Sequence, residues 1–273
     1  MTWLQTLWTA RTPSTSAEMI WPGGSAAGFS FDLVVDWEGT RPWTYQLKFR
    51  DDAGQEVLRV AQYDDGRMAV IGLSEGEITS RAVTDTTDQF RWSSSLKLYD
   101  HSGQPTSDTM VYDDGRVVTT LYSDGALSSR QIEDAEDALA WETISDIFDA
   151  DGALLSRLKV YDDGRVSEAL YADGIKQSAV TTDVEDAFVW REVARDYDEA
   201  GALAEQRTLY DDGREMVAEF DGGVRTLMTM TDTADTRNWS HYVDRFDDEG
   251  TRLSREKVFD DGRVVVTEFD PMS

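Results

Sequence analysis

The chain has 273 residues, with 26 lysines and arginines against 54 aspartates and glutamates, which gives a net charge of −28 at neutral pH. Such an acidic surface repels nucleic-acid phosphates and anionic lipid, and no run of 18 apolar residues is present, so nucleic-acid binding and membrane insertion are excluded. The absence of cysteine excludes disulfides and thiol catalysis, whereas an apolar fraction of 40% is enough to build a core.

Residues 1–27 precede the regular part of the chain. They lack the basic start and the unbroken apolar stretch of a secretory signal, so they do not define a compartment. We interpret them as a strap, or as a docking segment with Trp3 and Trp8 as anchors. Attachment of this kind favours an extracellular or assembly-associated location over a cytoplasmic one.

The rest of the chain repeats with a period of 49 residues. A tryptophan opens each repeat, at Trp43, Trp92, Trp141, Trp190 and Trp239. An Asp-Asp-Gly-Arg motif ends at Arg67, Arg116, Arg165, Arg214 and Arg263. Other glycines, and an aromatic residue before the motif, keep the same register. A period of this length is typical of proteins in which each repeat is one supersecondary unit.

Each repeat predicts four antiparallel strands and no helix. In the repeat 92–140, runs of strand-forming residues cover 92–99, a stretch that ends at 112, then 116–122, and a stretch that ends near 133. Turn residues separate the runs, with glycines where a positive φ angle is expected. The short spacing between turns indicates that each strand pairs with the next one along the chain.

The two ends of the repeat region complement each other. Residues 28–36 match the fourth strand of a repeat, and residues 239–269 supply the first three strands of the last one, which residues 28–42 would complete. We therefore predict that 28–270 is a single domain, a closed five-bladed β-propeller in which 28–36 pairs with 264–270. An open or spiral β-sheet array of the same strands is the alternative.

Two family resemblances follow from these motifs. The segments 148–154, 197–203 and 246–253 resemble the YD repeats of RHS-type proteins, and this resemblance implies a curved open β-sheet. The five tryptophan-marked repeats are similar in number and length to those of tachylectin-type five-bladed lectins, which implies a propeller. The second similarity is one of architecture, and a fold alone does not determine function.

The recurring tryptophans and arginines are the candidate ligand-binding residues. The tryptophans could stack on sugars or wedge adjacent repeats together, and the arginines could clamp a ligand or pair with an aspartate of their own turn. The topology gathers the Asp-Asp-Gly-Arg turns and the connections between repeats on one rim. Sites built from them would recur and bind through avidity, and the negative charge favours a neutral or cationic ligand.

We predict a non-catalytic binding or scaffolding protein whose partner is a glycan, bound multivalently, or another protein. The alternatives are a structural component of an extracellular, secretion or virion assembly attached through residues 1–27, and a glycosidase-like enzyme. No carboxylate pair stands out for catalysis, and His101 and His241 occupy unlike positions in the repeat. We expect no cofactor; calcium at the aspartate-rich turns is the one metal that the sequence suggests.

Overall fold

The computed structural model describes residues 30–269, which divide into two compact units, 30–113 and 114–269. We call them the N-terminal unit and the C-terminal unit. All regular structure in the described residues is β-strand, twenty strands in total, and no helix occurs among them. The prediction of an all-β repeat protein is confirmed.

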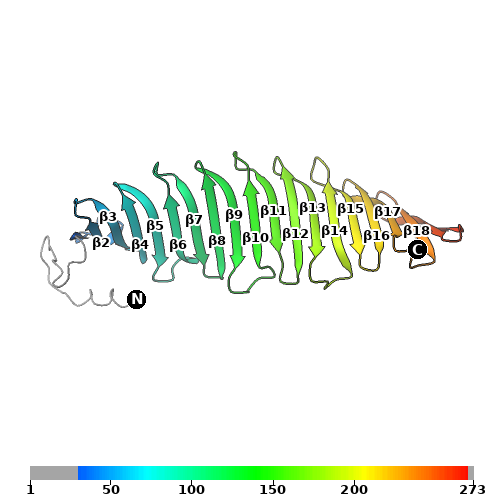
Figure 1. Ribbon diagram of the computed structural model, residues 1–273, viewed down its shortest axis with the longest axis horizontal. Coiled ribbons are helices and arrows are strands. Elements are labelled where there is room, and N and C mark those ends of the chain that lie inside the picture. Colours follow the sequence, from blue (N-terminus) through cyan, green and yellow to red (C-terminus); the bar gives the residue numbers. More distant parts are fainter. Residues whose placement is uncertain (1–29, 270–273) are drawn as a thin grey trace. The chain divides into compact units, whose positions relative to one another are not determined.

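The N-terminal unit is a seven-stranded sheet in which each strand pairs antiparallel with the next one along the chain (Figure 1). Its strands are β1 (Ser30–Val35), β2 (Trp43–Arg50), β3 (Glu56–Tyr63), β4 (Arg67–Ser74), β5 (Glu77–Asp85), β6 (Trp92–Tyr99) and β7 (Pro105–Tyr112).

The C-terminal unit continues the same pattern with thirteen strands, again paired in chain order. They are β8 (Arg116–Ser123), β9 (Ala126–Asp134), β10 (Thr143–Phe148), β11 (Leu154–Val160), β12 (Arg165–Ala172), β13 (Ile175–Asp183), β14 (Trp190–Tyr197), β15 (Leu203–Tyr210), β16 (Arg214–Asp221), β17 (Val224–Asp232), β18 (Trp239–Phe246), β19 (Arg252–Phe259) and β20 (Val264–Glu268).

The closed five-bladed propeller is not confirmed. Blades of a propeller are separate sheets, but here the fourth strand of one repeat pairs with the first strand of the next, as β5 does with β6 and β13 with β14. Strand β1 pairs with β2, and β20 pairs with β19; among residues 30–269 no pair joins 28–36 to 264–270. The sheets are open, because the connection after each fourth strand returns the chain at ladder spacing.

The two faces of each sheet follow from strand alternation and from the registers. One face, which we call the polar face, carries a central row of directly opposed residues across the strands. In the N-terminal unit this row is Asp32, Lys48, Arg59, Ile71, Arg81, Lys97 and Asp108. In the C-terminal unit it includes Arg130, Asp146, Arg157, Ala169, Ala179, Arg195, Gln206, Ala218, Met228, Asp244 and Arg255.

Few side chains in these sheets are fully buried. The buried apolar residues lie mainly on the polar face and are mostly small, and in the N-terminal unit Ala69, Ile71 and Val83 form a cluster against Tyr63 and Trp92. With no second layer described, cross-strand neighbours supply most of the packing. The polar face is therefore both the better packed and the more charged side of each sheet.

Candidate binding site

The Asp-Asp-Gly-Arg motif forms a tight turn between the second and third strands of a repeat. In the first repeat the amide of Gly66 donates to the carbonyl of Tyr63, and Gly66 has a φ angle of +83°. The amide of Arg67 donates to Asp65 Oδ1, and its guanidinium pairs with the same carboxylate at 2.6 Å. Arg116 and Arg165 pair in the same way, through Nε and Nη2, with the second aspartate of their own turns, and Arg214 pairs with Asp212 through Nε. This is the geometry expected of an arginine that stabilises its own turn.

The connection between repeats is held by another aspartate that recurs in every repeat. Asp85 Oδ2 accepts a hydrogen bond from the amide of Phe90, five residues ahead, at 2.7 Å, and Asp183 does the same with Phe188. Asp88, the next aspartate of the connection, adopts a φ angle of +56°, which aspartate tolerates better than most residues. These side chains close the connection into a compact loop.

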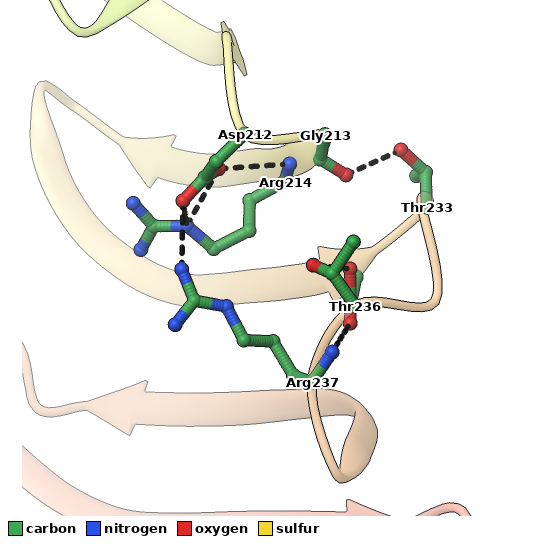
Figure 2. A network of polar contacts seen from close by, with 7 residues as sticks. Asp212, Gly213, Arg214, Thr233, Thr236 and Arg237 are labelled. Carbon is green, nitrogen blue, oxygen red and sulfur yellow. Dashed lines mark hydrogen bonds and ion pairs between the residues drawn. The ribbon is translucent and has the colours of Figure 1, made fainter.

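The motif turn and the connection contact each other, as Figure 2 shows for the fourth repeat. The hydroxyl of Thr233 donates to the carbonyl of Gly213 at 2.6 Å, and Arg237 from the connection reaches Asp212 at 2.9 Å, beside Arg214. The motif turn and the connection of this repeat therefore lie side by side, and the polar groups named here are used to hold the two loops.

In three of the turns the first aspartate of the motif has a raised pKa. Burial, together with the negative charges of Asp137 and Asp134, raises the pKa of Asp162 above its ordinary value. The pKa values of Asp211 and Asp260 are raised for the same reasons. In contrast, a hydrogen bond from Arg165 lowers the pKa of Asp163, the neighbouring residue. In this turn the motif thus combines a stabilised carboxylate at Asp163 with one at Asp162 whose negative charge is disfavoured.

Trp43, Trp92, Trp190 and Trp239 lie on the polar face at the start of the first strand of their repeats, whereas Trp141 precedes β10 by two residues. Trp43 is buried and contacts the guanidinium of Arg41, whereas the other four tryptophans are half-buried. Trp92 stacks on Phe90, and Trp190 stacks on Phe188 from the equivalent connection. Rings held in this way brace the connections and keep one part exposed.

The central row of the polar face differs from repeat to repeat. The buried carboxylate of Asp146 lies between Arg130 and Arg157, with a closest nitrogen–oxygen distance of 2.6 Å to each. Although burial alone raises the pKa of Asp146, hydrogen bonds from the two arginines bring it below its ordinary value. At the equivalent positions of the preceding repeat stand Arg81, Lys97 and Asp108. The charge order changes from plus–minus–plus to plus–plus–minus.

A hollow of about 210 Å³ opens on the polar face of the N-terminal unit at this changed triad. It spans β4 to β7, with Trp92 and Tyr99 from the two ends of β6 in its wall. All of its lining residues belong to the polar face, and they are Arg67, Arg81, Val83, Trp92, Ser95, Lys97, Tyr99, Asp108 and Met110. The hollow thus combines the aromatic side chains of Trp92 and Tyr99 with the cationic side chains of Arg81 and Lys97.

Arg81 is the unusual residue of the hollow. Its direct neighbours in the row are Ile71 on one side and Lys97 on the other, and like charges opposite each other destabilise a strand pair. The Nε atom of Arg81 is buried and has no hydrogen-bond partner in the described residues. Lys97 pairs with Asp108 at 2.9 Å, so that carboxylate is already engaged. The site carries a buried donor and no acceptor for it.

The described residues contain no group of three or more histidine, cysteine, aspartate or glutamate side chains that could hold a metal ion. They also contain no helix long and apolar enough to cross a membrane. No protein-family model matches the chain, and no curated protein is significantly similar to it. The resemblances to YD repeats and to tachylectin-type lectins accordingly stay predictions.

The predicted site residues can be placed relative to the hollow only in part. Trp92 and Arg67, both predicted ligand-binding residues, line the hollow, whereas the docking residues Trp3 and Trp8 lie outside the described residues. Arg81 and Lys97 were missed because they belong to no recurring motif. They could have been found by a different comparison, which looks for equivalent positions whose charge changes sign from one repeat to the next.

Proposed function

We propose that the protein is a non-catalytic binding scaffold, an open repetitive β-sheet whose polar face binds a carboxylate-bearing ring compound, such as an acidic sugar, in the hollow at Arg81. The observation that carries this proposal is the buried Nε of Arg81, which lacks a partner. In the next repeat the same position, Arg130, is satisfied by the carboxylate of Asp146. A ligand carboxylate would accept the hydrogen bond of Arg81 as the carboxylate of Asp146 accepts that of Arg130.

The rest of the hollow suits such a ligand. Guanidinium groups bind carboxylates through paired, charge-assisted hydrogen bonds, and half-buried Trp92 and Tyr99 offer ring surfaces for stacking. The net charge of −28 opposes anions at long range, but screening at physiological salt limits that repulsion to about 8 Å. Because the hollow is small and open, one site gives a weak, millimolar affinity, in keeping with a scaffold that acts through several contacts.

The test is a titration with glucuronate, followed by NMR and by tryptophan fluorescence, with glucose as the uncharged control. We expect saturable binding of glucuronate and at least tenfold weaker binding of glucose. Arg81→Ala should abolish the difference, whereas Arg195→Ala, an arginine of the same row in a later repeat, should leave it intact. Equal binding of the two sugars, or no change in Arg81→Ala, would reject the site.

A double variant makes the test sharper. Lys97→Asp combined with Asp108→Arg gives the hollow the charge order of Arg130, Asp146 and Arg157, so that the protein supplies the carboxylate itself. This variant should be at least as stable as the wild type and should no longer bind glucuronate. Loss of binding without loss of stability separates a ligand site from a role in folding.

A structural component of a larger assembly is the second candidate, and the other face of the N-terminal unit favours it. Its registers contain 23 residues on β1 to β7, and only Glu77, at the start of β5, is charged, although 29% of the chain is charged. Leu33, Leu96 and Leu98 are among its exposed side chains. The large apolar residues of this face are Phe31, Leu33, Val35, Tyr45, Leu47, Phe49, Leu58, Val60, Met68, Val70, Leu96, Leu98 and Val111.

A face of this size with a single charged residue at one strand end is a typical contact surface. If it is exposed in solution, the wild type should bind a fluorescent apolar dye such as ANS, and Leu96→Lys with Leu98→Lys should reduce that signal without changing the circular dichroism spectrum. The attachment segment of the earlier prediction, residues 1–27, lies outside the described residues. If the dye signal is absent, the face is covered and this second candidate loses its support.

A further inference from the structure

The two outermost strands, β1 and β20, present edges that match. All five residues of β20 are exposed, and Val264, Val265 and Val266 have exposed fractions of 52%, 41% and 58%. The unpaired N–H and C=O groups of an exposed, β-branched edge are a template for adding another strand. By its position in the repeat β20 is a third strand, and β1 is a fourth strand.

Within the repeats, third and fourth strands pair with each other in one fixed register. Third and fourth strands pair in β4–β5, β12–β13 and β16–β17, always with the arginine of the Asp-Asp-Gly-Arg motif opposite the aspartate of the connection, as Arg214 is opposite Asp232. The equivalent residues at the two edges are Arg263 and Asp36. The same register places Val264 opposite Val35, Val265 opposite Val34 and Val266 opposite Leu33, all apolar pairs.

The connection after β1 already has the geometry that this pairing needs. Asp36 Oδ2 accepts a hydrogen bond from the amide of Arg41 at 2.7 Å, as Asp85 does from Phe90. Gly39 has a φ angle of +62°, which matches the positive φ angles at the equivalent position of the other connections. The loop is formed, although among residues 30–269 no strand occupies the place beside β1 that a third strand occupies in the other repeats.

The glycine of the last motif shows where such a loop would dock. A Cβ atom added to Gly115 or Gly164 would lie 2.7 Å or 2.5 Å from the glutamate of the following connection, which packs on the glycine. Gly262 has nothing within 4 Å of the same point. At the equivalent position on the other edge, Glu38 is exposed, and its neighbour Trp37 is 81% exposed. Gly262 therefore leaves open the space that a glutamate fills at Gly115 and Gly164, and Glu38 is the glutamate at the equivalent position.

We propose that β20 of one molecule pairs with β1 of a second copy of this chain, in the register of β16 with β17, and that the molecules join head to tail. The pairing places Glu38 of the partner loop on Gly262 and completes a four-stranded repeat across the interface. A heterologous contact of this kind does not close, so it generates open chains of molecules. The charge of −28 on each molecule opposes assembly, and salt therefore promotes it. This inference is independent of the hollow.

Crosslinking between two single-cysteine variants tests the pairing, because the chain has no cysteine of its own. Val34→Cys and Val265→Cys are mixed in 0.5 M salt and treated with a short bismaleimide. We expect a covalent dimer in the mixture and at least a tenfold weaker dimer band from either variant alone. Cβ atoms of opposed residues lie about 5 Å apart, within reach of the reagent.

Sedimentation velocity on the cysteine-free protein supplies an independent readout. Assembly should increase with protein and salt concentration, and Val266→Lys should weaken it at least tenfold. Leu253→Lys adds the same charge one strand inside the edge and should have a smaller effect. A protein that stays monomeric in high salt, with no crosslink in the mixture, would overturn the proposal. So would an internal crosslink in a monomeric Val34→Cys, Val265→Cys double variant, since it would show that the two edges pair within one chain.

Discussion

Replacement of Asp146 by asparagine should destabilise the C-terminal unit more than any other single loss of an aspartate charge. The carboxylate has no solvent exposure and accepts hydrogen bonds from Arg157 at 2.6 Å and from Arg130 at 2.6 Å. Asparagine keeps the volume but leaves two guanidinium groups without a counter-charge. The effect therefore measures the charge–charge interaction and not a cavity.

The magnitude follows from the exposure of the partners. A hydrogen bond to a charged group contributes about 1.5–3 kcal/mol. The two arginine side chains are 37% and 39% exposed and can regain water, so we take the lower end for each of them. The loss is then about 3 kcal/mol, which corresponds to a fall of about 6–12 °C in the melting temperature for a unit of this size.

Thermal and urea unfolding, monitored by circular dichroism, measure this loss. The control is Asp151→Asn, which removes the same charge from an exposed turn and should shift the melting temperature by less than about 2 °C. Hydrogen exchange should place the loss of protection in β9 to β11. If the two variants are equally stable, then the buried triad contributes nothing and the reasoning is wrong.

The chain itself supplies a compensated replacement. At the equivalent positions of the following repeat stand Ala179, Arg195 and Gln206, and Arg195 donates to Gln206 at 3.2 Å. The triple variant Arg130→Ala, Asp146→Arg, Arg157→Gln should therefore stay within about 1 kcal/mol of the wild type, because exchange of a whole ion-pair cluster is often neutral. A large loss in the triple variant would mean that shape, and not charge balance, determines stability here.

The pH dependence of this contribution has a defined sign. Because the pKa of Asp146 is lowered in the folded protein, the contribution is fully present above the ordinary value of 3.8 and is lost as the pH falls further. The stability difference between the wild type and Asp146→Asn should therefore be constant near neutral pH and should shrink below pH 3.8. A difference that instead grows on acidification would contradict this assignment.

Two further predictions concern the Asp-Asp-Gly-Arg turns. Asp162→Asn should raise the melting temperature at low salt, because the pKa of this carboxyl is raised and its negative charge opposes folding near neutral pH. Asp163→Asn should instead lower the melting temperature, because the pKa of Asp163 is lowered. High salt should reduce both shifts. Gly164→Ala should lower the free energy of unfolding by more than the roughly 1–2 kcal/mol that a left-handed φ angle alone costs, because the added Cβ would meet Glu185. Gly152→Ala is the control, since it has the same backbone strain but open space around the added Cβ. Urea unfolding measures both variants.

The strands were predictable from local signals. Turn residues alone placed the strand limits in the repeat 92–140 within a few residues of β6 to β9, because aspartates and glycines with positive φ angles end each strand. The structure adds the reason for the spacing. Asp85 and Asp88 recur because the first caps the connection and the second adopts a left-handed conformation within it. The recurrence of these two aspartates is explained by the loop that they form.

The architecture was not predictable from the same signals. The complementary fragments at the two ends are consistent with a ring, but an open array that begins on a fourth strand gives the same residue count. The choice depends on whether the first strand of a repeat pairs with the preceding repeat, as Ser80 to Thr84 of β5 do with Leu98 to Ser94 of β6. That pairing is a property of loop conformation and sheet twist, which the residue pattern does not encode.

The candidate site escaped motif analysis for a physical reason. Residues at the rims perform the same task in every repeat, so they recur, whereas residues of the central row need only balance the charges of their direct neighbours. Asp146 balances two arginines and Asp244 balances Arg255, but Arg81 faces Lys97 and keeps an unused donor. In a repeat protein, structural residues are found by what is shared between repeats. A ligand site is better sought where a charged group of the row has no partner, as the buried Nε of Arg81 has none in the described residues.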